Sequence, residues 1–70
     1  MEVVRSDEAG QLAAAVRTLP TRQRQAVICR YYLELDERET ATLLGIGTGS
    51  VKRHTHRAIK ALGTRLEVAP

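Results

Sequence analysis

This 70-residue chain has few of the residues on which several common functions depend. It contains two tyrosines and no phenylalanine or tryptophan, which argues against binding of single-stranded nucleic acid by stacking of bases on aromatic side chains. Its one cysteine, Cys29, excludes an internal disulfide and a cysteine-rich zinc site. Because no apolar run is long enough to span a membrane and no signal-peptide pattern opens the chain, we expect a cytoplasmic protein with no membrane partner.

The residues that are present predict a small folded domain with an anionic partner. Hydrophobic residues make up 43% of the chain, the net charge is +3 and the pI is about 9.6. The charge is uneven: residues 48–66 hold five Lys or Arg, two His and no acid, whereas residues 34–39 hold four acids and one Arg. Basic residues concentrated at one end of a chain are typical of nucleic-acid binding.

The hydrophobic pattern predicts four helices and no strand, and therefore an all-α fold. The first helix is expected to begin near residues 6–7, where Ser or Asp can cap it. Leu12, Val16 and Leu19 then follow at helical spacing, and Pro20 ends the helix.

The second helix is expected to start at Thr21 and to run through "RQRQAVICRYYL". Its core face is predicted to hold Val27, Ile28 and Tyr31. Cys29 is predicted to be a small buried apolar residue.

The third helix has the clearest start signal in the chain. Asp36 is followed three residues later by Glu39, which is a capping-box pattern with Asp in place of Ser or Thr. The helix is expected to stop at Gly45, which can adopt a left-handed cap.

The segment "GIGTGSVKRHTHRAIKAL" (residues 45–62) then raises three functional hypotheses. A phosphate-binding loop is excluded because two residues separate Gly49 from Lys52 and because Ser50 occupies the position of the third glycine in a dinucleotide fingerprint. A metal site is excluded because His54 and His56 are two positions apart and so diverge on a helix. No carboxylate pair or nucleophile–base arrangement is present, so we expect no enzyme activity and no cofactor.

The third hypothesis, binding of double-stranded DNA, agrees with the helical periodicity of the fourth helix. A short helix, the glycine turn 45–47 with Ile46 at its centre, and a longer basic helix from Thr48 form a helix-turn-helix pattern. One arc of the fourth helix is predicted to be buried: Val51, Thr55, Ala58, Ile59, Leu62 and Leu66. The opposite arc is basic: Lys52, Arg53, His56, Arg57 and Lys60. His54 and Arg65 fall on one flank. A basic arc can also be a merely solvated surface, but its place directly after the turn favours a helix that enters the DNA major groove.

Residues 19–62 resemble region four of the bacterial RNA polymerase sigma factors, especially the extracytoplasmic-function group. The resemblance rests on "LPTRQR", on "RYY", on "LLG" before the turn and on "GSVKR…HRA…AL" taken together. It implies a four-helix domain whose last helix binds the promoter −35 element. It also implies docking on the β flap of RNA polymerase, the sequestration by an anti-sigma factor that is often seen in the family, and a monomer. By position, the DNA-binding residues it implies are Ser50, Lys52, Arg53, His56, Arg57 and Lys60.

The expected organisation is an N-terminal helix of the domain in residues 1–18, the helix-turn-helix domain in residues 19–66 and a tail in residues 67–70. A LuxR-type response-regulator output domain is the main alternative, because it has a similar third-to-fourth helix string but binds DNA as a dimer. A module that only binds an acidic protein through its basic face is a second alternative.

Several positions depart from the sigma pattern. Gly47 stands where a capping Ser is usual, so we expect Thr48 to cap the fourth helix and the helix to start one residue later. Thr40 and Thr55 occupy positions that are usually Ile or Leu. A threonine hydroxyl can bond back to its own helix backbone, but we expect the lost packing to cost about 1 kcal/mol or more per site. His56 replaces a commonly larger residue, which alters the expected base preference.

Overall fold

The computed structural model describes residues 6–66, with side chains from residue 10 to residue 63, and within that range it contains helices and no strands. The helices are α1 (Ser6–Arg17), α2 (Thr21–Val27), the π-helical segment η1 (Ile28–Tyr32), α3 (Glu37–Leu44) and α4 (Thr48–Leu66). The all-α prediction is confirmed. The predicted tail, residues 67–70, lies outside the described residues, as do the side chains of Arg65 and Leu66.

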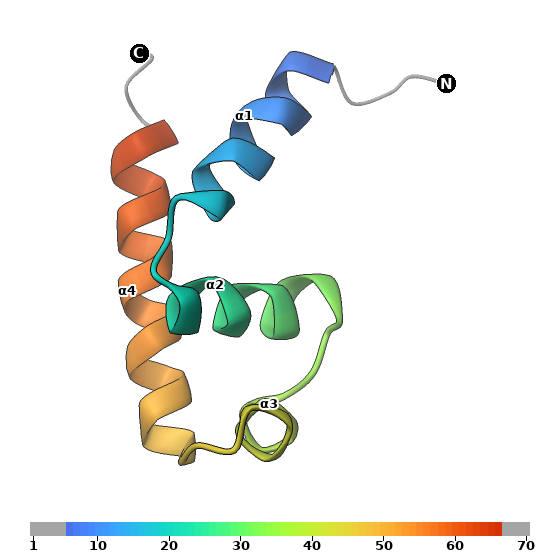
Figure 1. Cartoon of the computed structure of the whole chain (residues 1–70), viewed down its shortest axis with the longest axis vertical. Coiled ribbons are helices and arrows are strands. Elements are labelled where there is room, and N and C mark those ends of the chain that lie inside the picture. The colour runs from blue at the N-terminus through green and yellow to red at the C-terminus, as the bar shows by residue number, and fades with distance from the viewer. Residues whose placement is uncertain (1–5, 67–70) are drawn as a thin grey trace.

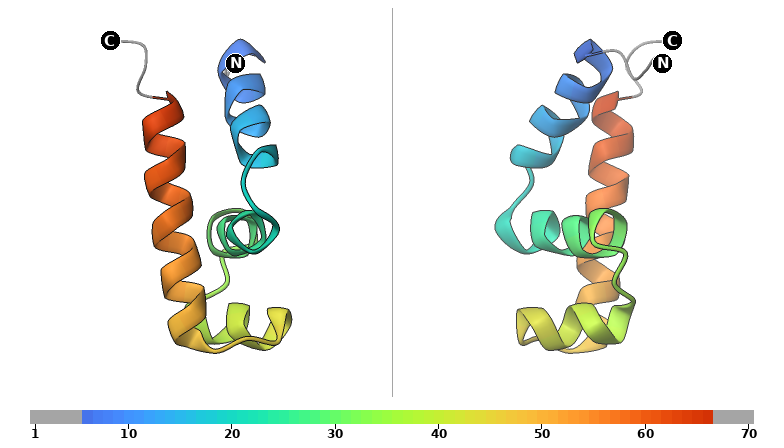
Figure 2. Two further views of the ribbon diagram at one scale, coloured as in Figure 1. Left: turned by 60° about the vertical axis from the view of Figure 1, so that its left-hand side comes forward. Right: turned by 90° about the vertical axis from the view of Figure 1, so that its right-hand side faces the viewer.

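The longest helix, α4, forms one side of the molecule, and the other helices pack against it in turn (Figure 1). The α1 helix lies beside the C-terminal half of α4, α2 crosses its middle, and α3 lies at its N-terminal end. The two rotated views in Figure 2 show the same order and show that α3 runs across the N-terminal end of α4 rather than along it. The basic helix α4 is therefore held by three other helices, and its first turns follow directly from α3.

The core is small and lies where α2 meets the middle of α4. Leu19, Val27 and Ala58 form its buried cluster, against which Ala61 and Leu62 pack while remaining partly exposed. Burial of such apolar surface contributes about 25 cal/mol per Å² to the free energy of folding. This cluster therefore fixes the position of α4 relative to α2.

The face of α4 that points to the core agrees with the predicted arc at most described positions. Val51 and Ala58 are fully buried, and Thr55 and Leu62 are partly buried. Ile59 contradicts the prediction, because 47% of its surface is exposed. It lies on the side of α4 where α1 and η1 diverge, so within residues 6–66 no helix covers it.

The second predicted helix is present but changes its geometry halfway. Cys29 is buried, as predicted, and Val27 is buried, but Tyr31 is 56% exposed and Ile28 only partly buried. The prediction that Tyr31 belongs to the core is therefore wrong. The wider turn of the π-helix, with the N–H of Leu33 donating to the carbonyl of Ile28 at 3.0 Å, shifts the later residues off the face that an α-helix would bury.

Thr40 is fully buried and Thr55 is partly buried, so both lie on the inner side as expected. Neither hydroxyl bonds to the backbone of its own helix, and neither has another hydrogen-bond partner among the described residues.

Candidate nucleic-acid interface

The start of α3 is fixed by the capping box that the sequence predicts. Asp36 Oδ1 accepts a hydrogen bond from the N–H of Glu39 at 2.7 Å, and Glu39 Oε1 accepts one from the N–H of Asp36 at 2.8 Å. These two bonds satisfy backbone donors that the first turn of a helix leaves without a partner. The first helix of the helix-turn-helix therefore begins at a defined residue.

The end of α3 and the turn after it are equally well defined. Gly45 adopts the left-handed conformation with φ of 70°, which a glycine reaches without steric cost. The N–H of Ile46 donates to the carbonyl of Ala41 at 3.1 Å, and the N–H of Gly45 donates to that of Thr42 at 3.3 Å. This pair of bonds is the Schellman motif, and it turns the chain sharply toward α4.

The start of α4 differs from the prediction at one residue. The helix begins at Thr48, and the carbonyl of Gly47 accepts the N–H of Val51 at 3.1 Å. This makes Gly47 the N-cap residue, because the N-cap carbonyl accepts the first bond of a helix. Thr48 is therefore the first helical residue rather than the cap. Glycine is tolerated at an N-cap, although it offers no side-chain acceptor to the N–H groups of the first turn.

The predicted DNA-binding residues share one face of α4. Five of them are exposed: Lys52, Arg53, His56, Arg57 and Lys60. Ser50 is partly buried at the beginning of the same helix, and the fully buried residues Val51 and Ala58 face the opposite way. The structure thus presents a cationic face on the helix that directly follows the turn.

Two of these side chains have polar partners close to the turn. Arg53 Nη2 donates to Ser50 Oγ at 3.3 Å, which links two predicted residues one turn apart. Lys52 Nζ lies 3.9 Å from Glu37 Oε1 in the first turn of α3. The hydrogen bond to Ser50 orients Arg53 along the exposed face. The ion pair places the carboxylate of Glu37 beside Lys52 on the same face.

The structure brings one further basic residue to this region that the sequence did not indicate. Arg22, in the first turn of α2, donates through Nη1 to the carbonyl of Leu44 at 3.2 Å and to Gln25 Oε1 at 3.2 Å. It therefore joins α2 to the C-terminal end of α3, where a cation complements the helix dipole. No local pattern signals this contact, because it depends on the packing of two helices.

Arg22 also acts on a histidine of α4. His54 is partly buried on the flank of the basic face. Partial burial, followed by the guanidinium groups of Arg53, Arg57 and Arg22, lowers the pKa of His54 below its ordinary value of 6.5. This environment therefore disfavours the charged form of His54.

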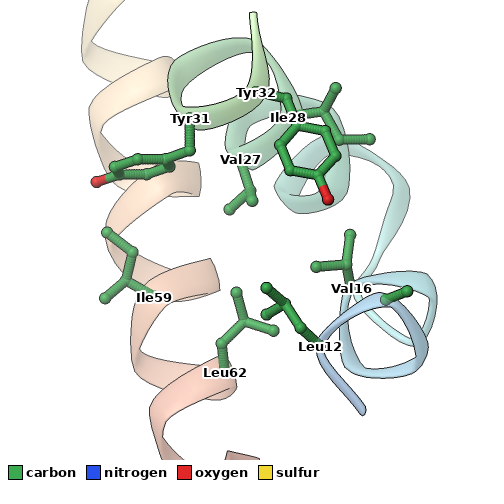
Figure 3. A pocket seen from close by; sticks show the side chains of 9 residues that line it. Leu12, Val16, Val27, Ile28, Tyr31, Tyr32, Ile59 and Leu62 are labelled. Carbon is green, nitrogen blue, oxygen red and sulfur yellow. The ribbon is translucent and has the colours of Figure 1, made fainter. Parts of the chain in front are cut away.

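An apolar groove of about 510 Å³ lies on another side of the molecule, between α1, η1 and α4 (Figure 3). Leu12 and Val16 of α1 face Val27 and Ile28 across it, with Ile59 and Leu62 of α4 along one edge. Tyr31 and Tyr32 of η1 complete its rim. The groove explains why Ile59 and Tyr31 are exposed, since both line an open surface rather than a closed core.

The described residues contain no group of three or more His, Cys, Asp or Glu side chains that could hold a metal ion. No helix within residues 6–66 combines the length and the apolar character needed to cross a membrane.

Comparison with known proteins assigns the domain to a family. Residues 9–62 match the family described as sigma-70, region 4. The chain is 38% identical over 56 residues to the RNA polymerase sigma-E factor of Streptomyces antibioticus, and 36% identical over 52 residues to that of Streptomyces avermitilis. These alignments cover 80% and 74% of this chain, but only 31% and 29% of the relatives, so the chain spans about a third of their length. The resemblance seen in the sequence is confirmed, and the match begins upstream of Leu19. This chain belongs to the sigma-70 region 4 family, whose members are helix-turn-helix DNA-binding domains of sigma factors.

Proposed function

We propose that this domain binds the promoter −35 element as part of a sigma factor that directs RNA polymerase to initiate transcription. One observation carries the proposal: an exposed cationic face on α4 directly after a turn fixed by the Schellman motif. Residues in the first turns of such a helix are the ones that reach base edges in the major groove.

The proposed contacts follow from the donors on this face. Lys52, Arg53 and Arg57 offer cationic donors that can bind guanine O6 and N7 or phosphate oxygens. The hydrogen bond to Ser50 holds Arg53 along the helix. Ser50 is the proposed contact to the DNA backbone at the helix start. His56 and Lys60 continue the face for one more turn.

The proposal includes a second surface for RNA polymerase. The apolar groove between α1, η1 and α4 suits an apolar helix of the β flap, because its lining offers almost no polar groups. An anti-sigma factor is a further proposed partner. The relatives are named RNA polymerase sigma-E factors, which supports polymerase as the partner. The proposed state of the domain in the cytoplasm is a monomer that gains affinity for DNA when polymerase is also bound.

The test is a titration of duplex DNA at two salt concentrations. A duplex enriched by the chain from a randomised library is compared with a scrambled duplex by fluorescence anisotropy. Lys52→Ala and Arg57→Ala are each expected to weaken binding to the enriched duplex, and loss of one phosphate contact reduces the slope of log K against log salt by about 1.

Arg17→Ala is the matched control, because Arg17 is an exposed arginine at the end of α1, outside the helix-turn-helix. It removes the same charge and is expected to change affinity little. Equal effects of Arg17→Ala and Arg57→Ala would contradict the assignment of α4 as the recognition helix. Equal affinity for the enriched and scrambled duplexes would contradict sequence-specific binding.

A further inference from the structure

Two hydrogen bonds tie the π-helical segment η1 to the residue just before α3. Arg30 Nη1 donates to the carbonyl of Leu35 at 2.8 Å. The N–H of Leu35 donates to the carbonyl of Cys29 at 2.9 Å. Leu35 is thus held through both its carbonyl and its N–H, and the next residue, Asp36, is the N-cap of α3. The start of α3 is therefore fixed to η1.

The other end of α3 is fixed to the same stretch of helix. Arg22 Nη1 donates to the carbonyl of Leu44, the last residue of α3, at 3.2 Å. Arg22 lies in the first turn of α2, and Arg30 lies in η1, which continues α2 without a break. Two arginines from opposite ends of one helical stretch thus hold the two ends of α3. Together they set the direction of α3 relative to α2.

The connection made by Arg30 is the stronger of the two. It is shorter than the bond from Arg22 to Leu44, and it is partly buried, whereas the bond of Arg22 is exposed. A hydrogen bond from a charged donor is about twice as strong as a neutral one, and it gains strength where water is partly excluded. We therefore expect the direction of α3 to depend mainly on Arg30.

This connection is formed at an energetic cost. Nε of Arg30 is buried and has no hydrogen-bond partner among the described residues, which is unfavourable for a donor. Residues 28–32 form a π-helix, a rare conformation that is frequent at functional sites. Glu34 has φ of 57°, which is strained for a residue other than glycine. Three unfavourable features thus lie within residues 28–35, and such strain clusters where geometry serves a function.

The direction of α3 matters because α3 and α4 act as one unit on DNA. In a helix-turn-helix the first helix crosses the DNA backbone while the second enters the major groove. The Schellman motif at Gly45 and the packing of α3 against the N-terminal end of α4 join the two helices (Figure 1). A change in the direction of α3 therefore changes how α4 enters the groove.

We propose that Arg30 is a positioning residue for DNA recognition: by holding Leu35 it sets the direction of α3, and through α3 it aligns the base-reading side chains of α4. The inference rests on the proposed binding of the −35 element and assigns a role to a residue that does not touch the DNA. Contacts to base edges carry the specificity and need precise placement, whereas phosphate contacts supply affinity for any sequence. Loss of the connection therefore reduces discrimination between sequences more than it reduces binding to DNA in general.

The test measures the ratio of the dissociation constants for the scrambled and the enriched duplex by fluorescence anisotropy. Partial unfolding weakens binding to both duplexes by the same factor, so a purely structural role of Arg30 leaves this ratio unchanged. Arg30→Met removes the donors and keeps an apolar stem, and it is expected to lower the ratio about three- to tenfold. Arg30→Lys keeps the charge but replaces the guanidinium fork with one shorter donor, and it is expected to lower the ratio about twofold.

Val27→Ala is the matched control, because Val27 belongs to the buried cluster and makes no bond to α3. It is expected to weaken binding to both duplexes equally. The salt dependence of binding to the scrambled duplex is expected to be the same in Arg30→Met as in the wild-type chain, because no phosphate contact is lost.

Three outcomes overturn the inference. An unchanged ratio in both Arg30 variants assigns Arg30 a structural role only, and if Arg30→Met does not fold, an unchanged ratio in Arg30→Lys alone is decisive. A salt slope reduced by about 1 in Arg30→Met makes Arg30 a phosphate contact instead. A ratio lowered as much by Val27→Ala assigns the loss to general destabilisation. All three leave the proposed function intact, whereas a wild-type chain without preference for the enriched duplex contradicts the proposed function itself.

Discussion

Lys52 Nζ on the exposed face of α4 lies 3.9 Å from Glu37 Oε1 in the first turn of α3. Both side chains reach solvent, with 71% of the lysine and 36% of the glutamate side chain exposed. Such an exposed pair contributes little to folding stability. Its importance lies in its position, because it places a negative charge next to a proposed DNA-binding cation.

Removal of this negative charge is expected to strengthen DNA binding. In Glu37→Gln the carboxylate no longer competes with phosphate for Lys52 or repels the DNA backbone, so affinity for the enriched duplex should rise about twofold at low salt. The free energy of unfolding should change by less than about 0.5 kcal/mol. Anisotropy titrations and urea denaturation measure the two quantities. Glu34→Gln, which removes the same charge from the loop before α3, is the control, and an equal gain in that variant would contradict a local effect at Lys52.

The reciprocal capping box of Asp36 and Glu39 predicts a specific loss of stability. Asp36→Ala removes the acceptor of the Glu39 N–H and should lower the free energy of unfolding by about 1 kcal/mol. For a domain of this size the thermal midpoint should fall by about 4–8 °C, as measured by circular dichroism. Glu39→Gln keeps an oxygen acceptor for the N–H of Asp36 and should cost much less. If both variants lost the same stability, the side-chain cap of Asp36 would not be the cause.

The buried hydroxyl of Thr40 predicts a stabilising substitution. Thr40 is fully buried, and its Oγ1 has no hydrogen-bond partner among the described residues. Thr40→Val replaces the hydroxyl with a methyl group of similar size and should raise the free energy of unfolding by about 1 kcal/mol, since a buried polar group without a partner costs about 1–3 kcal/mol. Thr40→Ser keeps the hydroxyl, loses the methyl group and should lower stability. Urea denaturation of both variants checks the prediction, and a loss of stability in Thr40→Val would show that the hydroxyl is satisfied in solution.

The features of this fold that the sequence predicted correctly are those set by neighbouring residues. Asp36 and Glu39 form the predicted cap, and Gly45 adopts the predicted left-handed conformation, because both depend on a few backbone groups within one turn. The inward face of α4 at Val51 and Ala58 follows from helical period alone. Local chemistry was therefore sufficient for both ends of α3 and for the inward face of α4, whereas the N-cap of α4 lies at Gly47 rather than at the predicted Thr48.

The features that the sequence did not predict depend on the angles between helices or on a change of helical geometry. Ile59 has the period of a core residue but faces a groove, because α1 and η1 diverge above it. Tyr31 is displaced by the π-helical turn. The hydrogen bond of Arg22 to the carbonyl of Leu44 joins α2 to the end of α3, and no periodicity within either helix indicates it.

The loop before α3 contains a backbone conformation that predicts a second stabilising change. Glu34 has φ of 57°, and it is the one described residue other than glycine with a positive φ. A side chain costs about 1–2 kcal/mol in this region, whereas glycine adopts it freely. Glu34→Gly should therefore raise the free energy of unfolding by up to about 1 kcal/mol, after allowance for the greater entropy of the unfolded chain. Glu34→Ala retains the strain and should bring no gain, and denaturation curves showing equal stability of the two variants would refute strain at this residue.

The apolar groove predicts that binding to polymerase and binding to DNA can be separated by single substitutions. Ile59 lines the groove and is 47% exposed, so Ile59→Gln should leave the fold largely intact while weakening binding to the isolated β flap about tenfold, because an apolar contact of the groove is replaced by a polar side chain. Leu43→Gln is the matched control, since Leu43 is 62% exposed on α3 and does not line the groove. Calorimetry with the flap measures the first interaction, and anisotropy with the enriched duplex should show unchanged affinity for Ile59→Gln. Sedimentation of the wild-type chain completes the test, because a domain that dimerises and does not bind the flap would contradict the groove as a polymerase-binding surface.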